Sequence, residues 1–330
     1  MIITVTLNAA IDKTLAVPNF RLGRRHRAVE QASMAGGKGV NVARALKALG
    51  QPVIATGLAG GPTGTRIIEQ LTDEAILNDF VRIREESRMS TAVVDPTSGE
   101  QTEINERGPA VSEAELELFV DKLLYLAKGA AVCVFSGSLP RGVDPGLYAR
   151  LVTELHRIGV LTVLDSEGEP LRLAARAGPG ILSPNELEAE ELVGHEFADE
   201  EDRRTALREM VELGAREALM TRADGCLALV GDDAARPRQL CRATLEPLEP
   251  VSSVGSGDAF LAGYVAARYG GREDLDCLRF GVACGAESTQ HFGAGVVDPR
   301  AVDRLFGEVA LDVEGAPALA PGDGPAPVAL

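Results

Sequence analysis

The segment Val254-Gly255-Ser256-Gly257-Asp258-Ala259-Phe260 places one carboxylate directly after a glycine-rich turn, at the start of an apolar run typical of a helix. Such a turn points backbone N–H groups and the positive end of the helix dipole at whatever lies in front of it. The pattern predicts an anion hole in which these backbone amides hold a transferring phosphoryl group. Asp258 would accept a proton from the attacking hydroxyl. The alternative is a structural turn with Asp258 as an ordinary helix N-cap.

A second glycine-rich segment, Ala35-Gly36-Gly37-Lys38-Gly39-Val40-Asn41-Val42, precedes another predicted helix. Glycines allow a ligand to approach the backbone closely, and Lys38 and Asn41 would project from the turn and the first helical turn. Neither standard nucleotide motif fits, because Val42 stands where a Rossmann fingerprint has its third glycine and Gly39 follows Lys38 where a P-loop has Ser or Thr. A tight turn before a packed helix is the alternative.

Around these segments, short apolar runs alternate with helical patterns. Strands are expected at 2–7, 53–58, 131–136, 160–165, 180–183, 217–221 and 226–230, and helices at 40–49, 64–75, 113–128, 145–158, 186–193, 200–213, 258–269, 273–291 and 299–309. Several of the strand runs are apolar on both faces, as strands covered by helices on both sides should be. The alternation predicts an α/β fold with a doubly wound, mostly parallel sheet.

Two stretches, 13–35 and 88–107, interrupt this alternation with short strand-like pieces and polar turns. We interpret them as antiparallel strands that project from the edge of the sheet as a small β lid. The expected organisation is a core of 1–12, 36–87 and 108–314, this lid, and a tail of 315–330. The tail is rich in Pro, Ala and Gly, a composition typical of disorder.

The formal net charge of -16 argues against nucleic acid and anionic membranes as partners. The dense cationic cluster Arg21, Arg24, Arg25, His26 and Arg27 falls in the predicted lid, where it suggests attraction of a phosphate or carboxylate. A solvated loop is the alternative. The five scattered cysteines favour reduced thiols in a cytoplasmic protein, and neither a signal peptide nor a membrane span is expected.

Further polar residues stand at the ends of predicted strands. Asn185 and Glu188 share one face of a first helical turn and can hold a hydrated Mg²⁺, although acidic residues also begin helices for dipole reasons. Ser138 follows the buried strand 131–136, at the edge where open α/β sheets bind ligands. Asp12, just after the first strand, either binds hydroxyls or closes a turn.

Taken together, these pieces resemble the ribokinase/PfkB family of carbohydrate kinases, from Thr4 to about Leu305. Gly-Gly-Lys-Gly-Val-Asn-Val-Ala-Arg-Ala-Leu (36–46) and Val-Gly-Ser-Gly-Asp-Ala-Phe (254–260) match its two signatures. The opening 4–14 and the segment Ser-Gly-Ser-Leu-Pro-Arg-Gly-Val (136–143) are similar to the subgroup of 1-phosphofructokinases, tagatose-6-phosphate kinases and the minor bacterial 6-phosphofructokinase.

The resemblance implies a ribokinase-like core with a β lid that often makes a dimer contact. It also implies a role for each matched residue. Asp258 would be the catalytic base beside the anion hole of Gly255, Ser256 and Gly257; Asp12, Gly37, Lys38 and Asn41 would meet the sugar; Arg27, Arg88 and Ser138, with Arg25 a weaker candidate, would hold the substrate's phosphate; Asn185, Glu188, Thr221, Gly225 and Gly257 would bind the nucleotide, with Glu188 reaching Mg²⁺ through water. A monovalent cation, K⁺, is a further implied cofactor near 251–253.

Two positions depart from the family pattern. Relatives carry a nucleotide loop like S-x-G-A-D-G, whereas Met220-Thr221-Arg222-Ala223-Asp224-Gly225 has Arg222 in place of the first glycine, or lacks that glycine under a shifted alignment. Ser183-Pro184 replaces the lysine-proline pair that usually precedes N-x-x-E. A side chain at 222 would either crowd a phosphate or bind it.

The resemblance therefore predicts ATP- and Mg²⁺-dependent phosphorylation of a phosphorylated ketohexose, with fructose 1-phosphate converted to fructose 1,6-bisphosphate. The alternatives are 6-phosphofructokinase or tagatose-6-phosphate kinase activity, a kinase of an unphosphorylated sugar or nucleoside, and a non-catalytic sugar-phosphate binding protein. The arginines of the lid favour an anionic substrate, which ribokinase or adenosine kinase activity would not require. The expected assembly is a homodimer formed through the lid.

Overall fold

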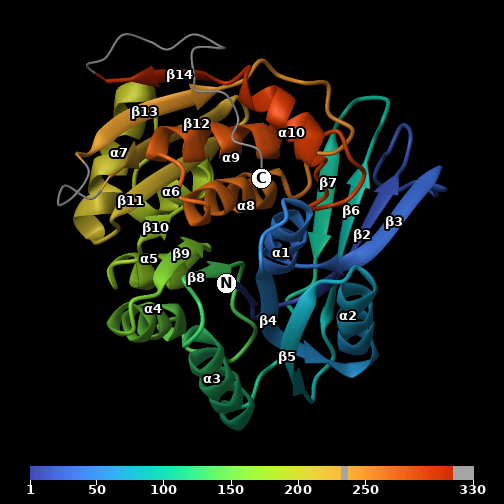
Figure 1. The fold of residues 1–330 in the computed structure, drawn as a ribbon. Helices are drawn as coiled ribbons and strands as arrows, with labels where there is room; N and C mark the ends of the chain where they lie inside the picture. The colour runs from blue at the N-terminus through green and yellow to red at the C-terminus, as the bar shows by residue number, and fades with distance from the viewer. Residues whose placement is uncertain (232–236, 315–330) are drawn as a thin grey trace.

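A computed structural model describes residues 1–231 and 237–314, which form two β-sheets with helices packed around the larger one (Figure 1). The tail that we expect to be disordered, 315–330, lies outside the described residues. No helix within the described ranges combines the length and the apolar character that a bilayer crossing requires.

Within the described residues the larger sheet has ten strands in the order β14-β13-β12-β11-β10-β9-β8-β1-β4-β5. Their bounds are β1 Ile2–Thr6, β4 Val53–Gly60, β5 Leu77–Ile83, β8 Val132–Ser136, β9 Leu161–Asp165, β10 Ile181–Leu182, β11 Glu217–Arg222, β12 Gly225–Val230, β13 Gln239–Thr244 and β14 Ala310–Val313. Neighbouring strands from β5 to β11 run parallel, and those from β11 to β14 pair antiparallel. The mostly parallel sheet is thus confirmed.

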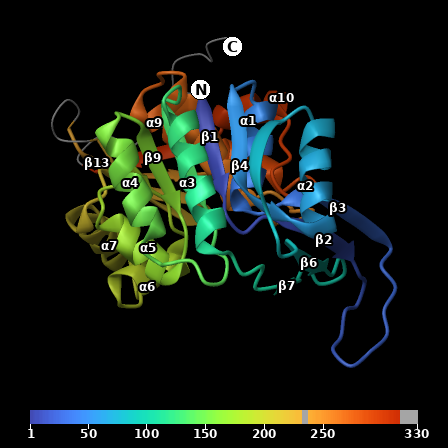
Figure 2. The ribbon, with the colours of Figure 1, turned by 90° about the horizontal axis from the view of Figure 1, so that it is seen from below.

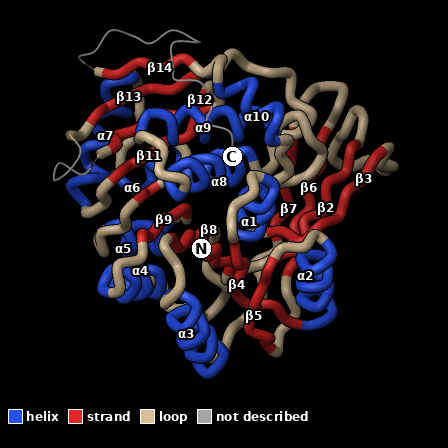
Figure 3. The backbone as a smooth tube through the Cα atoms, viewed as in Figure 1, coloured by secondary structure: helices blue, strands red, loops and turns tan. Residues whose placement is uncertain are grey.

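Helices cover both faces of this sheet because its central strands are apolar on both sides, as the tube view shows (Figure 3). In β1, Ile2 packs into one layer, while Ile3 and Val5 pack into the other. The first layer contains α1 Lys38–Ala48, α2 Gly61–Asp73, α8 Ser256–Tyr269, α9 Asp274–Ser288 and α10 Pro299–Phe306; the second contains α3 Glu113–Ala127, α4 Leu147–Arg157, α5 Gly168–Ala175, α6 Glu186–Val193 and α7 Glu200–Leu213.

The small sheet has the strand order β3-β2-β6-β7 and forms the lid. Its strands are β2 Ala10–Ala16, β3 Glu30–Gly36, β6 Arg88–Val94 and β7 Gln101–Asn105, so the lid begins at Ala10 and not after residue 12. Figure 2 shows the loop between β2 and β3 extending away from the rest of the molecule.

Our description of the lid strands as antiparallel is wrong for one pair. β2 and β6 run parallel, whereas β2 with β3 and β6 with β7 are antiparallel. Between β3 and β6 the chain passes through α1, β4, α2 and β5 of the core. Parallel neighbours require such a crossover, and the sequence pattern within the lid alone gives no sign of it.

Four elements were not expected from the sequence: β5, β13, β14 and α5. β5 and β14 are the edge strands of the large sheet, and each mixes buried with exposed residues. Edge strands face solvent along one side, so they lack the continuous apolar character by which the central strands were found.

Helices α8 and α9 pack closely on the first face of the sheet. A Cβ atom on Gly263 of α8 would lie 2.6 Å from the Sγ of Cys284 on α9, so this contact requires a glycine. All five cysteines lie within the described residues, where each is buried and none forms a disulfide. Burial raises the pKa of the Cys284 thiol well above its ordinary value.

Candidate active site

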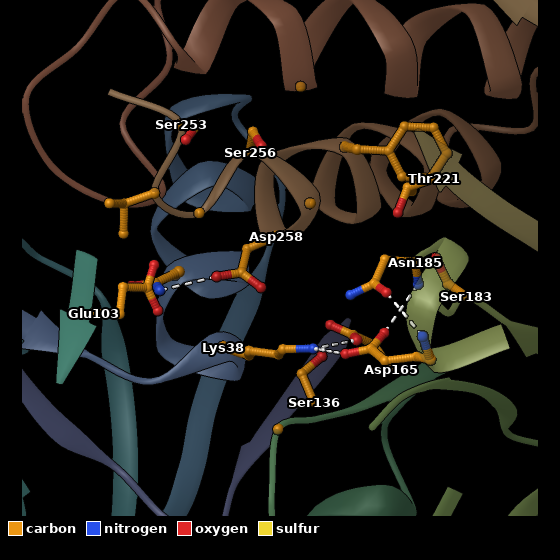
Figure 4. Close-up of a pocket in the computed structure, with 18 of the residues that line it drawn as sticks. Lys38, Glu103, Ser136, Asp165, Ser183, Asn185, Thr221, Ser253, Ser256 and Asp258 are labelled. Atoms are coloured by element: carbon orange, nitrogen blue, oxygen red, sulfur yellow. Dashed lines mark hydrogen bonds and ion pairs between the residues drawn. The ribbon is translucent and has the colours of Figure 1, made fainter. Parts of the chain in front are cut away.

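A pocket of about 1340 Å³ lies between the lid and the edge of the large sheet where β1, β8, β9 and β11 end. Its wall includes the first residues of α1 and α8 and the turn between β11 and β12 (Figure 4). Parallel strands end at one edge of a sheet, so polar residues that follow different strands meet there.

Asp258 is the third residue of α8, and the helix N-cap is Gly255, which caps the helix with no side-chain hydrogen bond. The carboxylate of Asp258 is 6% exposed and accepts a hydrogen bond from Asn41 Nδ2 at 2.9 Å. The alternative of Asp258 as an N-cap is therefore wrong. Burial, together with the nearby charge of Asp165, raises the pKa of Asp258 to about 8. A carboxylate tuned in this way is a candidate general base.

The two glycines of this turn stand at their positions for different reasons. Gly255 has a φ of 77°, and a Cβ atom there would lie 2.7 Å from the Cβ of Ala294, so the fold itself requires a glycine. A Cβ atom on Gly257 would meet nothing within 4 Å. The lack of a side chain at Gly257 therefore leaves open the space in front of the helix N-terminus.

Lys38, the first residue of α1, points across the pocket toward two carboxylates. Its Nζ lies 2.8 Å from Asp165 Oδ1 and 3.1 Å from Glu188 Oε1. Burial disfavours the charge on Lys38, but the two carboxylates outweigh burial and raise the pKa of Lys38. Lys38 is therefore a fixed positive charge at the start of α1, close to the end of β9 and the first turn of α6.

Asn185 and Glu188 form a capping box at the start of α6. The Asn185 side chain accepts a hydrogen bond from the Glu188 N–H, and the Glu188 side chain accepts one from the Asn185 N–H, each at 2.9 Å. Among the described residues no cluster of three or more His, Cys, Asp or Glu side chains is arranged to hold a metal ion. The carboxylates of Glu188 and Asp165 both line the pocket.

Asp12 and Asn41 lie side by side behind the second glycine-rich turn. The Gly37 N–H donates to Asp12 Oδ2 at 3.3 Å, and a Cβ atom on Gly36 would lie 1.9 Å from the same oxygen. Burial raises the pKa of the Asp12 carboxyl, although the Gly37 hydrogen bond opposes this shift. The glycines of this turn thus allow a carboxylate to lie against the backbone at the pocket wall.

Ser138 and Arg88 lie at the other end of the pocket, and Asn8 connects them. Asn8 Nδ2 donates to Ser138 Oγ at 3.2 Å, and Arg88 Nε donates to the Asn8 carbonyl at 3.1 Å. Three buried oxygens of pocket-lining side chains, Thr6 Oγ1, Asn8 Oδ1 and Ser136 Oγ, have no hydrogen-bond partner within the protein part described.

Thr221, Arg222 and Gly225 form the wall opposite the lid. Thr221 forms a bridge with Asn185 in parallel orientation, which brings the end of β11 beside the start of α6. A Cβ atom on Gly225 would lie 2.0 Å from the Ala243 carbonyl oxygen, so pairing with β13 already explains this glycine. Arg222 lines the pocket, and its Nη1 lies 2.8 Å from Glu200 Oε2.

The predicted site residues are brought to this single pocket with two exceptions, Arg27 and Arg25. Arg27 lies in the exposed loop between β2 and β3 and is not among the residues that line the pocket, and neither is Arg25. Asn8 and Asp165 are among the pocket residues that were not predicted. Each follows or ends a buried strand, so the argument that identified Ser138 applies to them as well.

Comparison with known proteins gives consistent matches along the chain. A family model described as pfkB family carbohydrate kinase matches residues 5–301. The chain is 33% identical over 286 residues to a 1-phosphofructokinase of Borreliella burgdorferi, covering 86% of this chain and 90% of that protein. It is 30% identical over 314 residues to a tagatose-6-phosphate kinase of Staphylococcus epidermidis, covering 94% and 98%. Phosphofructokinase-2 of Escherichia coli, solved with substrates and products, aligns with a TM-score of 0.83 at 28% identity, covering 92% of this chain and 98% of that one.

Proposed function

This chain belongs to the pfkB family of carbohydrate kinases, and on that basis we propose that it transfers the γ-phosphoryl group of ATP to fructose 1-phosphate, giving fructose 1,6-bisphosphate and ADP. The observation that carries the proposal is the buried carboxylate of Asp258 beside the open N-terminus of α8. The relatives that are named as sugar-phosphate kinases support an anionic substrate.

In this proposal Asp258 accepts the proton of the sugar hydroxyl as its oxygen attacks the γ-phosphorus. The bond from that phosphorus to the leaving oxygen of ADP breaks, while the amides of Ser256 and Gly257 hold the developing negative charge. Lys38 lies between Asp165 and Glu188 at the floor of the pocket and supplies a fixed cation. Mg²⁺ bound with ATP would neutralise charge on the nucleotide phosphates.

The sugar would lie against Asp12, Gly37 and Asn41, with its existing phosphate toward Arg88 and Ser138. All five of these residues line the pocket. Tagatose 6-phosphate and fructose 6-phosphate present a similar phosphate and hydroxyl. Measuring kcat/KM for the three sugar phosphates decides among them, and a preference for either of the other two would overturn the choice of fructose 1-phosphate.

The nucleotide would occupy the half of the pocket bounded by β11, β12 and the segment 245–250. Thr221 and Gly225 lie on this wall, and Asn185 and Glu188 also line the pocket.

A K⁺ site near 251–253 stays a prediction, and replacing K⁺ by Na⁺ in the assay tests it. A K⁺ complex is known for phosphofructokinase-2 of Escherichia coli.

The central experiment replaces Asp258 by Asn and measures ADP release with fructose 1-phosphate and ATP. General-base catalysis contributes about 10²–10⁴-fold, so we expect kcat to fall by that factor with little change in the KM of either substrate. Asp303→Asn, at an exposed position on α10, is the matched control and should keep full activity. Near-normal turnover in Asp258→Asn would remove Asp258 as the base.

A further inference from the structure

Arg44, on α1, is a buried charged residue that lines no part of the pocket. Its exposure is 8%, and all three of its guanidinium nitrogens donate hydrogen bonds. Burying a cation lowers the stability of the folded protein unless all its donors are paired, so we ask what the buried guanidinium of Arg44 does.

The partners of Arg44 come from four parts of the chain. Nε and Nη2 donate to the two carboxylate oxygens of Glu74 at 2.6 and 3.0 Å, which is a bidentate ion pair. Nη2 also donates to the Ala35 carbonyl at 2.6 Å, and Nη1 donates to the Ala294 carbonyl at 3.1 Å. The remaining bond runs from Nη1 to Asn41 Oδ1 at 3.2 Å.

This last bond favours one orientation of the Asn41 side-chain amide. With its oxygen toward Arg44, the amide turns its NH₂ group toward Asp258 Oδ2, 2.9 Å away. The flipped amide would place its oxygen against the carboxylate of Asp258 and its NH₂ group against the guanidinium of Arg44. Both contacts would then be repulsive, so Arg44 holds Asn41 in the orientation that donates to Asp258.

Arg44 also supports the glycine-rich turn in front of α8 through its hydrogen bond to Ala294. The Ala294 carbonyl that it binds belongs to a segment packed against Gly255, where an added Cβ atom would lie 2.7 Å from the Ala294 Cβ. The next residue, Gly295, is packed against the backbone of Asn41, since a Cβ atom there would lie 2.4 Å from the Asn41 carbonyl oxygen. One guanidinium therefore contacts both the side chain that binds Asp258 and the segment that supports its turn.

We propose that Arg44 is a positioning residue for phosphoryl transfer, which fixes the side-chain amide of Asn41 so that this amide donates a hydrogen bond to the carboxylate of Asp258. The proposal rests on the proposed function, in which Asp258 is the general base. Arg44 itself touches neither substrate, so its removal should change the ionisation of Asp258 and not the binding of ATP.

The charged groups that face Asp258 come from three other elements: Lys38 on α1, Asp165 at the end of β9 and Asp12 on β2. Lys38 favours the ionised form of Asp258, while the two carboxylates disfavour it. The positive charge of Arg44 lowers the pKa of Asp12, so Arg44→Met also acts on Asp258 through Asp12. Arg44→Lys keeps this charge, and a change in the ionisation of Asp258 in that variant is therefore expected to pass through Asn41.

The test compares wild type, Arg44→Lys and Arg44→Met by the pH dependence of kcat/KM for ATP, which reports the ionisation of the enzyme form that binds ATP. Neither substituent can form the fork that binds Asn41 and Glu74 together, so the amide of Asn41 is released and the hydrogen bond to Asp258 weakens. Loss of a hydrogen bond to the ionised form disfavours that form, so we expect the acid limb to move to higher pH by about half to one unit. The KM for ATP at pH 9.5 or above should stay unchanged.

Glu74→Gln is the matched control, because it removes the ion pair on the far side of Arg44 and leaves the bond to Asn41 in place. We expect this variant to lower the melting temperature without moving the acid limb. In an Asn41→Ala background, Arg44→Lys should cause no further shift. The proposal is overturned by an acid limb that is unmoved in folded Arg44 variants, by an equal shift in Glu74→Gln, or by a shift that persists without Asn41. Absence of kinase activity in the wild type would instead refute the proposed function.

Discussion

At the residue scale, the cost of keeping Asp258 buried should be visible in the stability of the protein. A carboxyl whose pKa rises on folding holds its proton more tightly in the folded state. Its contribution to the free energy of unfolding therefore falls as pH rises from 3.8 to about 8. Asp258→Asn removes this ionisation, so the variant should melt a few degrees above wild type at pH 9.

The same measurement at lower pH provides the check on this explanation. The difference in melting temperature between Asp258→Asn and wild type should shrink as pH falls from about 8 toward 4, because both side chains are then neutral in the folded state. A difference independent of pH would show that the substitution acts through packing and not through ionisation.

Individual site residues were predictable from sequence where the local chain carries the signal. Asp258 and Lys38 each follow glycines at the start of a helix, and the structure places both at the pocket. Arg44 could not be identified in this way, because its partners lie as far away in the chain as Ala294. Arg27 was assigned by resemblance, and nothing in the sequence of a single chain shows that its loop extends away from the pocket.

At the scale of the element, a substitution at Gly257 tests whether glycine is needed there for the stability of α8 or for binding of the phosphoryl group. A methyl group at this position meets no protein atom within 4 Å, and alanine is the better helix residue. We therefore expect Gly257→Ala to fold with equal or greater stability, by up to about 1 kcal/mol. The methyl group would nevertheless occupy the space before the N-terminus of α8, lowering kcat/KM by roughly 10²–10³-fold, as for loss of one oxyanion donor.

Thermal unfolding and the ADP-release assay on the same preparation test this expectation. Gly255→Ala is the contrasting variant and should lose stability, because its residue has a positive φ and contacts Ala294. If Gly257→Ala keeps both stability and activity, the phosphoryl group does not approach this turn.

The turn between β11 and β12 carries the second element-scale prediction. Among the described charged side chains that line this half of the pocket, Arg222 is positive, whereas Glu186, Asp224 and Glu246 are negative. Arg222 lies 3.6–3.8 Å from Asp224 and Glu186, and its Nη2 has no hydrogen-bond partner among the described residues. It is thus placed to offset this acidic wall when a nucleotide phosphate arrives.

We expect Arg222→Ala to raise the KM for ATP about tenfold while leaving the KM for the sugar phosphate unchanged. Arg242→Ala is the matched control: Arg242 pairs with Asp224 at 2.6 Å in the same network but does not line the pocket. Equal effects of the two variants would mean that the network supports the turn and that Arg222 does not meet the nucleotide.

Which elements the sequence could predict depended on their place in the sheet. Central strands such as β1 and β8 are buried on every residue, and their apolar runs are readily found. The edge strand β5 begins Leu77-Asn78-Asp79 and is half exposed, so it lacks that pattern. The pairing of β2 with β6 depends on a crossover through the core, which no local pattern specifies.

At the scale of the whole molecule, the lid carries exposed apolar side chains that suit the expected homodimer. Leu22 is 90% exposed, Val29 70% and Ile104 62%. Changing them together to Ser, Thr and Thr should give a monomer where the wild type is a dimer, as measured by light scattering after size-exclusion chromatography.

The control for this prediction uses two exposed side chains outside the lid. Leu118 and Tyr125 on α3 are 55% and 72% exposed, and replacing both by Ser should leave the measured mass unchanged. A wild-type protein that is already monomeric, or a tetramer that survives the lid substitutions, would refute the lid as the dimer contact. A tetrameric form is known for phosphofructokinase-2 of Escherichia coli.

The close contact of Gly263 with Cys284 has a practical consequence for following motion in this protein. The Cys284 thiol is fully buried between α8 and α9, so a thiol-labelling reagent reaches it only when the two helices separate. The rate of its modification, resolved by mass spectrometry from that of the other four cysteines, therefore measures how often α8 and α9 separate. Because Asp258 lies in the first turn of α8, ligands that bind at that end of the helix should slow the modification of Cys284 without contacting its sulfur.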